Sequence, residues 1–519
     1  MGETHLRSKP ILLPKPALPL SASWYIIEHM DYEPVIGLEV HAELQTQSKM
    51  FCGCAVVDST QAEPNLYVCP VCVGMPGSLP VVNQRAVEYG IMVGLALHCR
   101  INPINVFSRK SYFYPDLPKG YQISQYDLPL AVNGWLTIEV DGEERRIGIR
   151  RVHLEEDTGK LLHMDGISLV DFNRSGVPLL EIVSEPDLHS LDEVRAYATK
   201  LRSILRYLGV SSGDMEKGVI RFEANVSVRP AGSTQLYTRT EIKNLNSFRA
   251  LLRAVEYEIN RQTALMRAGG TVKQQTLGWD EGRDMTVPQR SKEFAEDYRY
   301  FPEPDLPPLE ISPAWVEQIA AQLPELPDAK RERFMLVYGL SRYDAGVLVA
   351  ERAVADYFEQ AVHESRAQAG PPISPKAIAN WITGEIFRLM KETDTEIEQV
   401  RVTPAQLVAL IRLVEAGTIN ANTGKEVLSE MFMSGRSAEA IVQERGLAQI
   451  SEESVLAQIV AQVLAGHPNE VQTYLSGKET VARWLMGQVM RATQGKANPA
   501  LAQRLLEEQL ARLKAIRSA

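Results

Sequence analysis

The stretch Val35–Leu44, VIGLEVHAEL, alternates between apolar and polar side chains. Ile36 and every second residue after it are apolar, whereas Glu39, His41 and Glu43 fall between them. Successive side chains of a β-strand point to opposite faces of its sheet. The stretch therefore predicts a strand with one face in the core and one polar face, on which two carboxylates and an imidazole lie in a row.

The same alternation recurs in residues 219–229, VIRFEANVSVR, and in residues 236–245, LYTRTEIKNL. The polar faces of these stretches carry acids, bases and an amide: Arg221, Glu223, Asn225, Ser227, Arg229, Arg239, Glu241 and Lys243. An antiparallel sheet with one solvated face would explain any one of these strands. The mixture of acids with bases favours instead a functional surface that the strands share.

Further carboxylates occur in two short runs, RVHLEEDTGK at residues 151–160 and VPLLEIVSEPD at residues 177–187. Carboxylates that converge on one surface repel each other unless a hard cation lies among them, and Mg²⁺ prefers oxygen ligands. A magnesium site near arginine and lysine suits nucleotide phosphates and phosphoryl transfer. The sequence has neither a P-loop nor a GxGxxG fingerprint, so a nucleotide would have to bind on the face of the sheet.

Two helices are predicted among these strands. Ser190 and Glu193 have the spacing of a capping box, and Val194, Leu201, Leu205 and Leu208 then form one apolar face. A second helix follows Ser247, with an apolar face formed by Phe248, Leu251, Leu252, Val255 and Ile259. Short strands that alternate with capped helices predict an α+β fold with a mainly antiparallel sheet.

The order of the elements predicts three domains after a short extension. A catalytic α+β domain spans residues 32–310, because the proline-rich stretch at 300–313 suits neither a helix nor a central strand. The rest of the chain has helical patterns, which Gly435 divides into an all-α domain at 311–436 and a small α-helical tail domain at 437–519. Residues 1–31 contain four prolines and few charges, which predicts a disordered extension and gives little support to a targeting peptide.

Four of the five cysteines lie within 21 positions, at Cys52, Cys54, Cys69 and Cys72. The spacing, C-x-C, 14 residues and C-x-x-C, offers the two close pairs of thiolates that tetrahedral zinc needs. A disulfide is disfavoured because an odd, clustered set of cysteines indicates a reducing cytosol, and a redox CxxC would leave the first pair unexplained. We predict a structural zinc site within an insertion at residues 52–72. Cys99 ends an apolar run, so we predict that it is a small hydrophobic residue buried in the core.

The composition is that of an ordinary soluble globular protein, with 45% hydrophobic and 23% charged residues. The longest apolar run, Tyr89–Cys99, is about half the length of a membrane span, so we predict a cytoplasmic protein without a transmembrane segment. The net charge of -10 disfavours general nucleic-acid binding. From Lys478 to the end, however, eight Lys and Arg stand against three Glu, a local charge of +5. This segment predicts a polyanionic partner, although a solvated helical tail would explain it equally.

Several long strings decide between these interpretations. They are YEPVIGLEVHAEL, KSYFYPDLPKGYQISQYD, RVHLEEDTGK, FNRSGVPLLEIVSEPD, EIKNLNSF and YRYFPEPDLPPL, in that order, followed near the end by SGKETVARWLMGQVMRATQGKANP. Over about residues 32–513 the chain resembles the B-type subunit of the bacterial-type aspartyl/glutamyl-tRNA amidotransferase. The E-type subunit of the archaeal, glutamyl-specific enzyme shares the catalytic region but carries an extra inserted domain, for which this chain has no room.

The resemblance implies a cradle-shaped catalytic domain related to the glutamine synthetase fold, then a helical domain and a tail domain. It implies an enzyme that uses Mg-ATP to phosphorylate the side-chain carboxylate of mischarged Glu-tRNA(Gln) or Asp-tRNA(Asn). Ammonia then displaces phosphate and leaves Gln-tRNA(Gln) or Asn-tRNA(Asn). A carboxylate is a poor electrophile, and the acyl phosphate supplies the leaving group that the amine displaces.

The resemblance also implies roles for individual residues. The magnesium and catalytic positions are Glu39, His41, Glu156 and Glu181. Supporting acids are Glu155 and Glu223, the latter near the cofactor. The motif near ATP or the acyl end of tRNA contains Arg109, Lys110, Tyr112, Tyr114 and Lys119. The candidate tRNA contacts of the tail are Lys478, Arg483, Arg491 and Lys496. A structural ion pair is the alternative for any one of them.

The source of ammonia is expected on another chain. Four cysteines are assigned to zinc and no serine-lysine amidase signature is present, so the sequence offers no glutaminase nucleophile. The resemblance implies a heterotrimer with the A-type glutaminase and the small C-type protein of the same amidotransferase. Two other functions stay open: a stand-alone ATP-dependent amide ligase for a free small acid, and a zinc-bearing tRNA-binding scaffold without chemistry.

Overall fold

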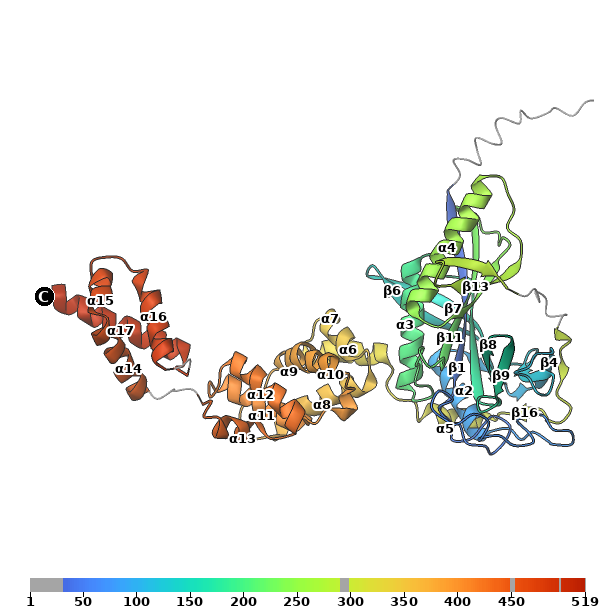
Figure 1. The fold of residues 1–519 in the computed structure, drawn as a ribbon, viewed down its shortest axis with the longest axis horizontal. Coiled ribbons are helices and arrows are strands. Elements are labelled where there is room, and N and C mark those ends of the chain that lie inside the picture. The colour runs from blue at the N-terminus through green and yellow to red at the C-terminus, as the bar shows by residue number, and fades with distance from the viewer. Residues whose placement is uncertain (1–30, 290–297, 449–452, 494–495, 519) are drawn as a thin grey trace, which may run out of the picture. The chain divides into compact units, whose positions relative to one another are not determined.

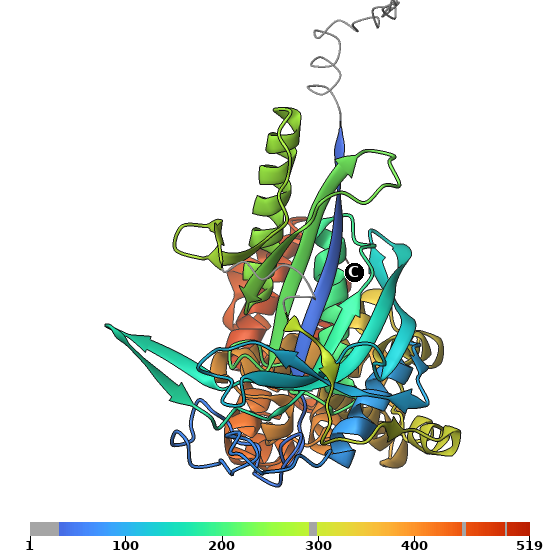
Figure 2. The ribbon, with the colours of Figure 1, turned by 90° about the vertical axis from the view of Figure 1, so that its right-hand side faces the viewer.

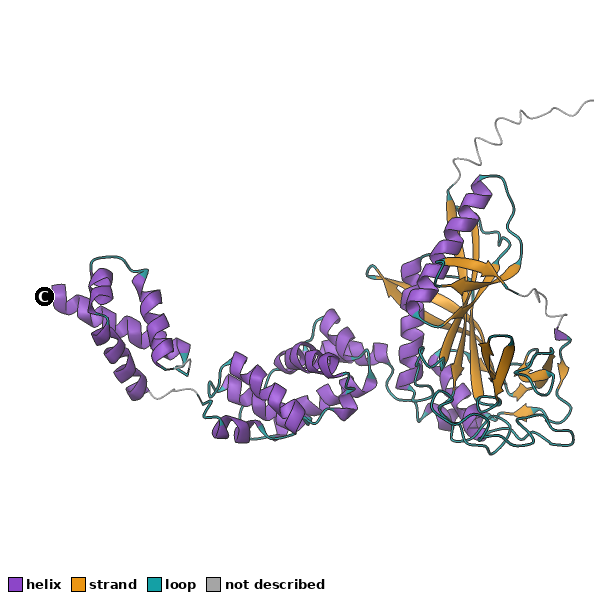
Figure 3. Ribbon diagram, in the orientation of Figure 1, coloured by secondary structure: helices purple, strands orange, loops and turns teal. Residues whose placement is uncertain are grey.

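The structure is a computed structural model that describes residues 31–289, 298–448, 453–493 and 496–518. The chain forms two compact units, with the division between Leu326 and Pro327. The first unit is rich in strands and the second is helical, as Figure 3 shows by colour. The predicted α+β class with a helical C-terminal part is confirmed at this level. The predicted extension at residues 1–31 lies, but for its last residue, outside the described residues.

A nine-stranded sheet organises the first unit (Figure 1). In spatial order its strands are β14 (Met285–Pro288), β13 (Gln275–Asp280), β12 (Thr240–Leu245), β11 (Ile220–Pro230), β1 (Tyr32–Glu43), β10 (Pro178–Ser184), β7 (Glu143–Glu156), β6 (Ala131–Val140) and β2 (Arg100–Ile101). Only β12 and β13 pair in parallel among these neighbours. The sheet is therefore mainly antiparallel, as predicted.

Strand β1 lies in the middle of the sheet, between β10 and β11, and is blue in Figure 2. Its alternation is confirmed, since Ile36, Leu38 and Val40 are fully buried while Glu39 and His41 are only half-buried. The apolar side chains belong to a core shared with the matching residues of β7, β10 and β11. The polar side chains of all four strands consequently share the opposite face.

Three helices pack onto the apolar face: α2 (Gln84–Ala96), α3 (Leu191–Tyr207) and α4 (Phe248–Arg267). Ser190 caps α3 and Ser247 caps α4, as predicted. The capping box at Ser190 is only half formed, because the Glu193 carboxylate accepts the N–H of His189 and pairs with Arg145. The predicted apolar faces lie against the core, which α2 completes on the β7 side.

Smaller strands lie beside the large sheet. One small sheet contains β4 (Phe107–Ser111), β5 (Tyr121–Gln125) and β15 (Phe301–Pro302). Two strand pairs are β3 (Ile104–Asn105) with β16 (Leu309–Glu310), and β8 (Lys160–Met164) with β9 (Ile167–Asp171). Strand β5 contacts β7, where Gln122 donates to the backbone carbonyl of Glu156. The β4–β5 sheet therefore borders the polar face.

The first unit extends beyond residue 310, where the sequence predicts a boundary. Helix α5 (Pro313–Ala320) packs Ile319 into the first core, and Leu323 and Leu326 lie against it too. The prolines before α5 break regular structure without ending the domain, because the apolar face of this short helix still needs the first core.

The second unit contains the remaining helices. They are α6 (Pro327–Tyr338), α7 (Arg342–Leu348), α8 (Arg352–Ala367), α9 (Pro375–Trp381), η2 (Ile382–Ile386), α10 (Phe387–Thr393), η3 (Ile397–Gln399), α11 (Pro404–Glu415), α12 (Ala421–Ser434), α13 (Ala438–Glu444), α14 (Glu453–Gly466), α15 (Pro468–Leu475), α16 (Val481–Ala492) and α17 (Pro499–Ser518). Two apolar clusters occur among their described residues, one from Phe334 to Val442 and one from Leu456 to Leu510. Gly435, left-handed with φ of 73°, ends α12.

Candidate active site

A cavity of about 190 Å³ opens on the polar face of the large sheet. Its floor comes from β1, β7, β10, β11, β12 and β13, and its walls come from β4, β5 and residues 298–300. The lining side chains are Glu39, His41, Lys110, Ser124, Tyr126, Arg151, His153, Glu181, Glu223, Asn225, Arg239, Glu241, Lys243, Gln274, Gln275, Thr276, Tyr298 and Tyr300. Acids and bases of the predicted polar faces thus line one cavity.

Strand register brings a row of two histidines and an acid together. His41 lies opposite Glu181 on β10, and Glu181 lies opposite His153 on β7. His41 Nε2 and His153 Nε2 each lie 3.3 Å from Glu181 Oε2. Glu155 joins the row, 3.8 Å from His41 Nε2 and 3.9 Å from His153 Nε2. One buried oxygen of Glu181 therefore faces both imidazoles.

The charges of this row depend on one another. Burial alone lowers the pKa of His41, but the hydrogen bond with Glu181 and the charges of Glu181, Glu223 and Glu155 raise it to about 9. Burial raises the pKa of Glu181, but the charges and hydrogen bonds of His153 and His41 prevail and hold it well below its usual range. The acids thus stay ionised in the interior because cations lie against them.

A second group of acids lies beside the first. Glu39 lies opposite Glu223, and Lys243 Nζ approaches Glu223 to 2.9 Å and Glu241 to 3.1 Å. Asn225 Nδ2 donates to Glu39 at 2.9 Å. Burial and the charges of the neighbouring acids raise the pKa of Glu39, whereas Lys243 and His41 overcome burial and lower the pKa of Glu223 to about 2.

Both groups have the donors that a hard cation prefers. One ligand atom each of His41, Glu155 and Glu181 lies within 4.8 Å of the others, and the same holds for Glu39, Glu223 and Glu241. Carboxylate oxygens are the ligands that Mg²⁺ and Ca²⁺ favour. The residues therefore fit one or two divalent cations on the floor of the cavity.

Basic and aromatic side chains form the walls above these acids. Lys110 Nζ lies 5.2 Å from the centre of the Tyr298 ring. The rings of Tyr126 and Tyr300 stack with centres 4.2 Å apart. Burial lowers the pKa of Lys110, but the neighbouring Tyr300 and the acids Glu155 and Glu181 raise it above its usual value. A positively charged amine thus faces the carboxylates across the cavity.

Glu39, His41, Lys110, Glu181 and Glu223 are the predicted site residues that line the cavity. Glu156, predicted as a magnesium position, does not line it. On β7 it has the parity of Leu154, which points into the core, whereas Glu155 has the parity of His153. The carboxylate of Glu156 accepts from Lys119 Nζ at 2.5 Å and from the N–H of Ile123 at 2.9 Å.

The rest of the predicted ATP motif also lies outside the cavity. Arg109 forms a bidentate ion pair with Glu303, at 2.7 Å for both contacts, because it points away from Lys110 on β4. Lys119 is held by Glu156. Tyr112 meets the edge of Tyr298, and Tyr114 is 39% exposed. Of this motif, Lys110 alone lines the cavity.

Several lining residues were not predicted as site residues. Arg151 and His153 precede Glu155 by four and two residues on the same strand face, so the period of a strand would have identified them. Tyr126, Tyr298 and Tyr300 have no such signal, because they lie outside the large sheet and enter the cavity through loops.

The comparisons with known proteins agree over nearly the whole chain. Residues 34–317 match the family described as GatB/GatE catalytic domain, and residues 356–510 match the family described as GatB domain. The B-type subunit of the aspartyl/glutamyl-tRNA(Asn/Gln) amidotransferase of Moorella thermoacetica is 56% identical over 93% of this chain and 100% of its own length. Proteins of the same name from Roseiflexus sp. and Thermodesulfovibrio yellowstonii are 54% and 53% identical, over 93% and 92% of this chain and 99% of their own lengths.

The chain belongs to the GatB family.

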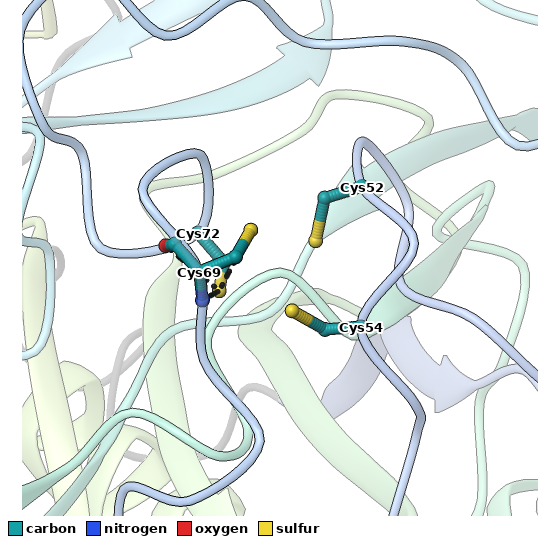
Figure 4. A group of neighbouring side chains, drawn as sticks. All are labelled: Cys52, Cys54, Cys69 and Cys72. Carbon is teal, nitrogen blue, oxygen red and sulfur yellow. Dashed lines mark hydrogen bonds between the residues drawn. The ribbon is translucent and has the colours of Figure 1, made fainter.

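The GatB/GatE catalytic segment contains all the residues of the cavity and the four clustered cysteines. In Figure 4 the sulfurs of Cys52, Cys54, Cys69 and Cys72 face a common centre, and they lie within 4.8 Å of one another. Four sulfurs about 2.3 Å from a tetrahedral zinc lie about 3.8 Å apart. The Cys69 and Cys72 sulfurs are 3.9 Å apart, so these cysteines fit zinc. Cys99 is buried in the first core, as predicted.

The GatB domain segment contains the four basic residues predicted to contact tRNA. Arg483 and Arg491 are exposed on α16, Lys478 is exposed just before it, and Lys496 is half-buried. None of the four lies near the cavity residues in sequence. Among the described residues, no helix combines the length and apolar character that crossing a membrane requires.

Proposed function

We propose that the chain is the amidating subunit of a tRNA-dependent amidotransferase, which converts Glu-tRNA(Gln) or Asp-tRNA(Asn) to Gln-tRNA(Gln) or Asn-tRNA(Asn). The family membership names the activity, and the cavity of converging acids and bases is the observation that supports a chemical role for this chain. ATP phosphorylates the side-chain carboxylate of the aminoacyl group. Ammonia then attacks the acyl phosphate and phosphate leaves.

Divalent cations are proposed on both acidic groups of the cavity floor. His41, Glu155 and Glu181 would hold one, and Glu39, Glu223 and Glu241 would hold another. Glu155 thus takes the role that the resemblance implies for Glu156, because Glu155 lies 3.8 Å from His41, which lines the cavity. Bound Mg²⁺ would neutralise the charge of the ATP phosphates, the main requirement of phosphoryl transfer.

The basic residues of the cavity would orient the two anionic substrates. Lys243 and Arg239 lie on β12 and beside it, and Lys110 faces them from the β4 wall. Fixed cations at an anionic reaction centre act without reorganisation when charge develops on phosphate oxygens. These three cations could bind both the substrate carboxylate and the γ-phosphate that is transferred to it.

The remaining assignments rest on the resemblance and on composition. The first unit is proposed to be a cradle related to glutamine synthetase, spanning residues 32–310 and extended to Leu326, with a structural zinc at residues 52–72. The tail at 437–519 is proposed to contact tRNA through its basic residues. Ammonia is proposed to come from glutamine through the A-type glutaminase, with the small C-type protein as the third member of a heterotrimer.

The test is amidation by the reconstituted complex of this chain with its partner proteins. We expect Glu-tRNA(Gln) or Asp-tRNA(Asn) to be amidated with ATP consumption, and Glu181→Gln to lower this rate by about 100-fold or more while tRNA binding persists. Amidation of free glutamate without amidation of charged tRNA would overturn the proposal in favour of a small-acid ligase. An unchanged rate in Glu181→Gln would reject the cavity as the active site.

A further inference from the structure

Lys49, three residues before the first clustered cysteine, has no exposed surface at all. Its Nζ lies 3.6 Å from the Cys72 sulfur and donates to the backbone carbonyl of Phe172 at 3.2 Å. Its own N–H donates to the carbonyl of Cys54. Lysine is almost never fully buried unless its ammonium group is paired, so this position requires a partner for its charge.

The partner of Lys49 is not a carboxylate. Within the part of the chain that the structure describes, Lys49 makes no ion pair with Asp or Glu, whereas the partly buried cations Lys119 and Arg221 each have one. The Cys72 sulfur is the only acidic group of the described residues at its ammonium. Sulfur thus takes the place of the missing carboxylate.

The charge of a zinc site explains why a cation lies here. Four thiolates around Zn²⁺ carry a net charge of about -2, and an unpaired charge in a protein interior is costly. We propose that Lys49 is the counter-cation of this cysteine cluster and offsets the negative charge of the zinc-bound cluster. The inference rests on the structural zinc proposed above.

Lys49 also links the cluster to the chain that enters β10. The carbonyl of Phe172 accepts from Lys49 Nζ, and Ser175 Oγ donates to the carbonyl of Cys72 at 2.9 Å. The backbone N–H of Met50 donates to the backbone carbonyl of Gly176 at 2.7 Å. Gly176 has φ of +83°, a left-handed conformation that favours glycine, and lies beside the Lys49 side chain. The segment continues into β10 with Glu181, so Lys49 positions this entry to the active-site strand.

The test replaces Lys49 by methionine, which has a similar length and no charge. Purified full-length protein is depleted of metal, and zinc affinity is measured by competition with a chromophoric chelator. We expect Lys49→Met to bind zinc about 10–100-fold more weakly than the wild type and to release it faster. Lys49→Gln, which retains a hydrogen-bond donor, should show the same loss because it also lacks the charge.

The matched control is Lys217→Met, which removes a lysine that pairs with Asp58 of the same loop but does not reach the sulfurs. It should bind zinc as the wild type does. Thermal unfolding supplies a second readout, since Lys49→Met should lower the unfolding midpoint of the zinc-loaded protein but not that of the metal-depleted protein. Equal affinity for zinc, or an equal loss of stability with and without zinc, would reduce Lys49 to a packing residue and overturn the inference.

The zinc proposal and this inference fail differently. Wild-type protein without zinc affinity, its thiols intact, would reject both. Wild-type protein that binds zinc while Lys49→Met binds it equally would reject only the role of Lys49. Neither result bears on amidation of charged tRNA, which the reconstituted complex tests separately.

Discussion

Glu155 and Glu156 are neighbours in the chain with different surroundings. Glu155 lies 3.8 Å from His41 in the acidic row, whereas Glu156 is tied to Lys119 and Ile123. If a cation is bound by the row, Glu155→Gln should lower the rate of amidation by about 100-fold. Glu156→Gln should change it far less. Single-turnover amidation of charged tRNA under saturating ATP measures both, with tRNA binding as the control; a larger loss in Glu156→Gln would contradict the assignment.

Glu258 is an ionised residue in the core behind the sheet. It has no exposed side-chain surface, and its carboxylate accepts from Nε and Nη2 of Arg261 at 2.9 and 2.6 Å and from Thr240 Oγ1 at 2.6 Å. Burial raises the pKa of Glu258, but the hydrogen bonds with Arg261, Thr240 and Gln262 outweigh it and lower the pKa. A carboxylate with a lowered pKa stabilises the fold above its unfolded pKa, and this stabilisation is lost as the pH falls through the folded value.

Glu258→Gln should therefore lower the free energy of unfolding of the first unit at neutral pH by about 2 kcal/mol. The difference from the wild type should shrink as the pH falls below the ordinary glutamate pKa of about 4.3, because the wild type then loses the charge that the variant lacks. Unfolding midpoints between about pH 7 and pH 2 measure it, and Glu281→Gln, at an exposed position, is the control. A difference that does not change with pH would show that charge is not what stabilises this site.

The sequence predicted the face on which a side chain lies wherever the two-residue period of a strand was enough to decide it. Alternation placed Glu39, His41 and Glu223 on one face, and strand register then brought Glu181 opposite His41. A shift of one residue reverses the face, and this is why Glu156 lies outside the cavity. The tyrosines of the walls could not be predicted, because loops without a period bring them in.

At the scale of elements, the apolar face of the sheet depends on close contact with α2. A Cβ on Gly90 of α2 would overlap the Leu130 side chain and lie 3.4 Å from Leu154 and 3.5 Å from Leu180. Leu154 and Leu180 precede Glu155 and Glu181, so this helix supports the strands of the active site. The glycine is explained by space, since the neighbouring leucines are fully buried and have little freedom to move.

Gly90→Ala should destabilise the first unit, because overpacking a core costs about 1–3 kcal/mol, more than the about 1 kcal/mol that alanine returns in a helix. Gly487→Ala is the matched control, since a Cβ on this glycine of α16 meets no atom within 4 Å. It should stabilise its helix slightly. Chemical denaturation followed by circular dichroism compares the two, and a gain of stability in Gly90→Ala would contradict the packing argument.

Elements were predicted well where a cap coincided with an apolar period, as in α3 after Ser190 and α4 after Ser247. The second hydrogen bond of the capping box, from the Ser190 N–H to the Glu193 carboxylate, is not formed, because this carboxylate pairs with Arg145. The competing contact comes from a residue that is distant in the sequence, so the local sequence around Ser190 cannot reveal it. The short α5 was missed as part of the first unit for the same reason, since its neighbours are distant in the chain.

At the scale of the molecule, chemistry and RNA recognition are proposed for separate parts of the chain. The cavity lies in the first compact unit, and the basic tail lies in the second. The second unit has two apolar clusters, to either side of residues 443–455, and α13 packs with the first of them, so the tail domain at 437–519 stays a prediction. Separate parts should be separable by mutation.

Charge reversal in the tail tests this separation. Arg483 and Arg491 are exposed on α16 and eight residues apart, so both project from the same side of the helix. The double variant Arg483→Glu/Arg491→Glu should weaken tRNA binding about 10-fold or more and reduce the salt dependence of binding by about 1 per lost phosphate contact. The rate of amidation at saturating tRNA and the affinity for ATP should stay close to those of the wild type, because the residues of the cavity are unchanged.

The control for this prediction is Arg366→Glu/Lys391→Glu, an equal change of charge at exposed positions of the same unit outside the tail. An equal loss of tRNA affinity in both variants would show that net charge, and not the tail, governs binding.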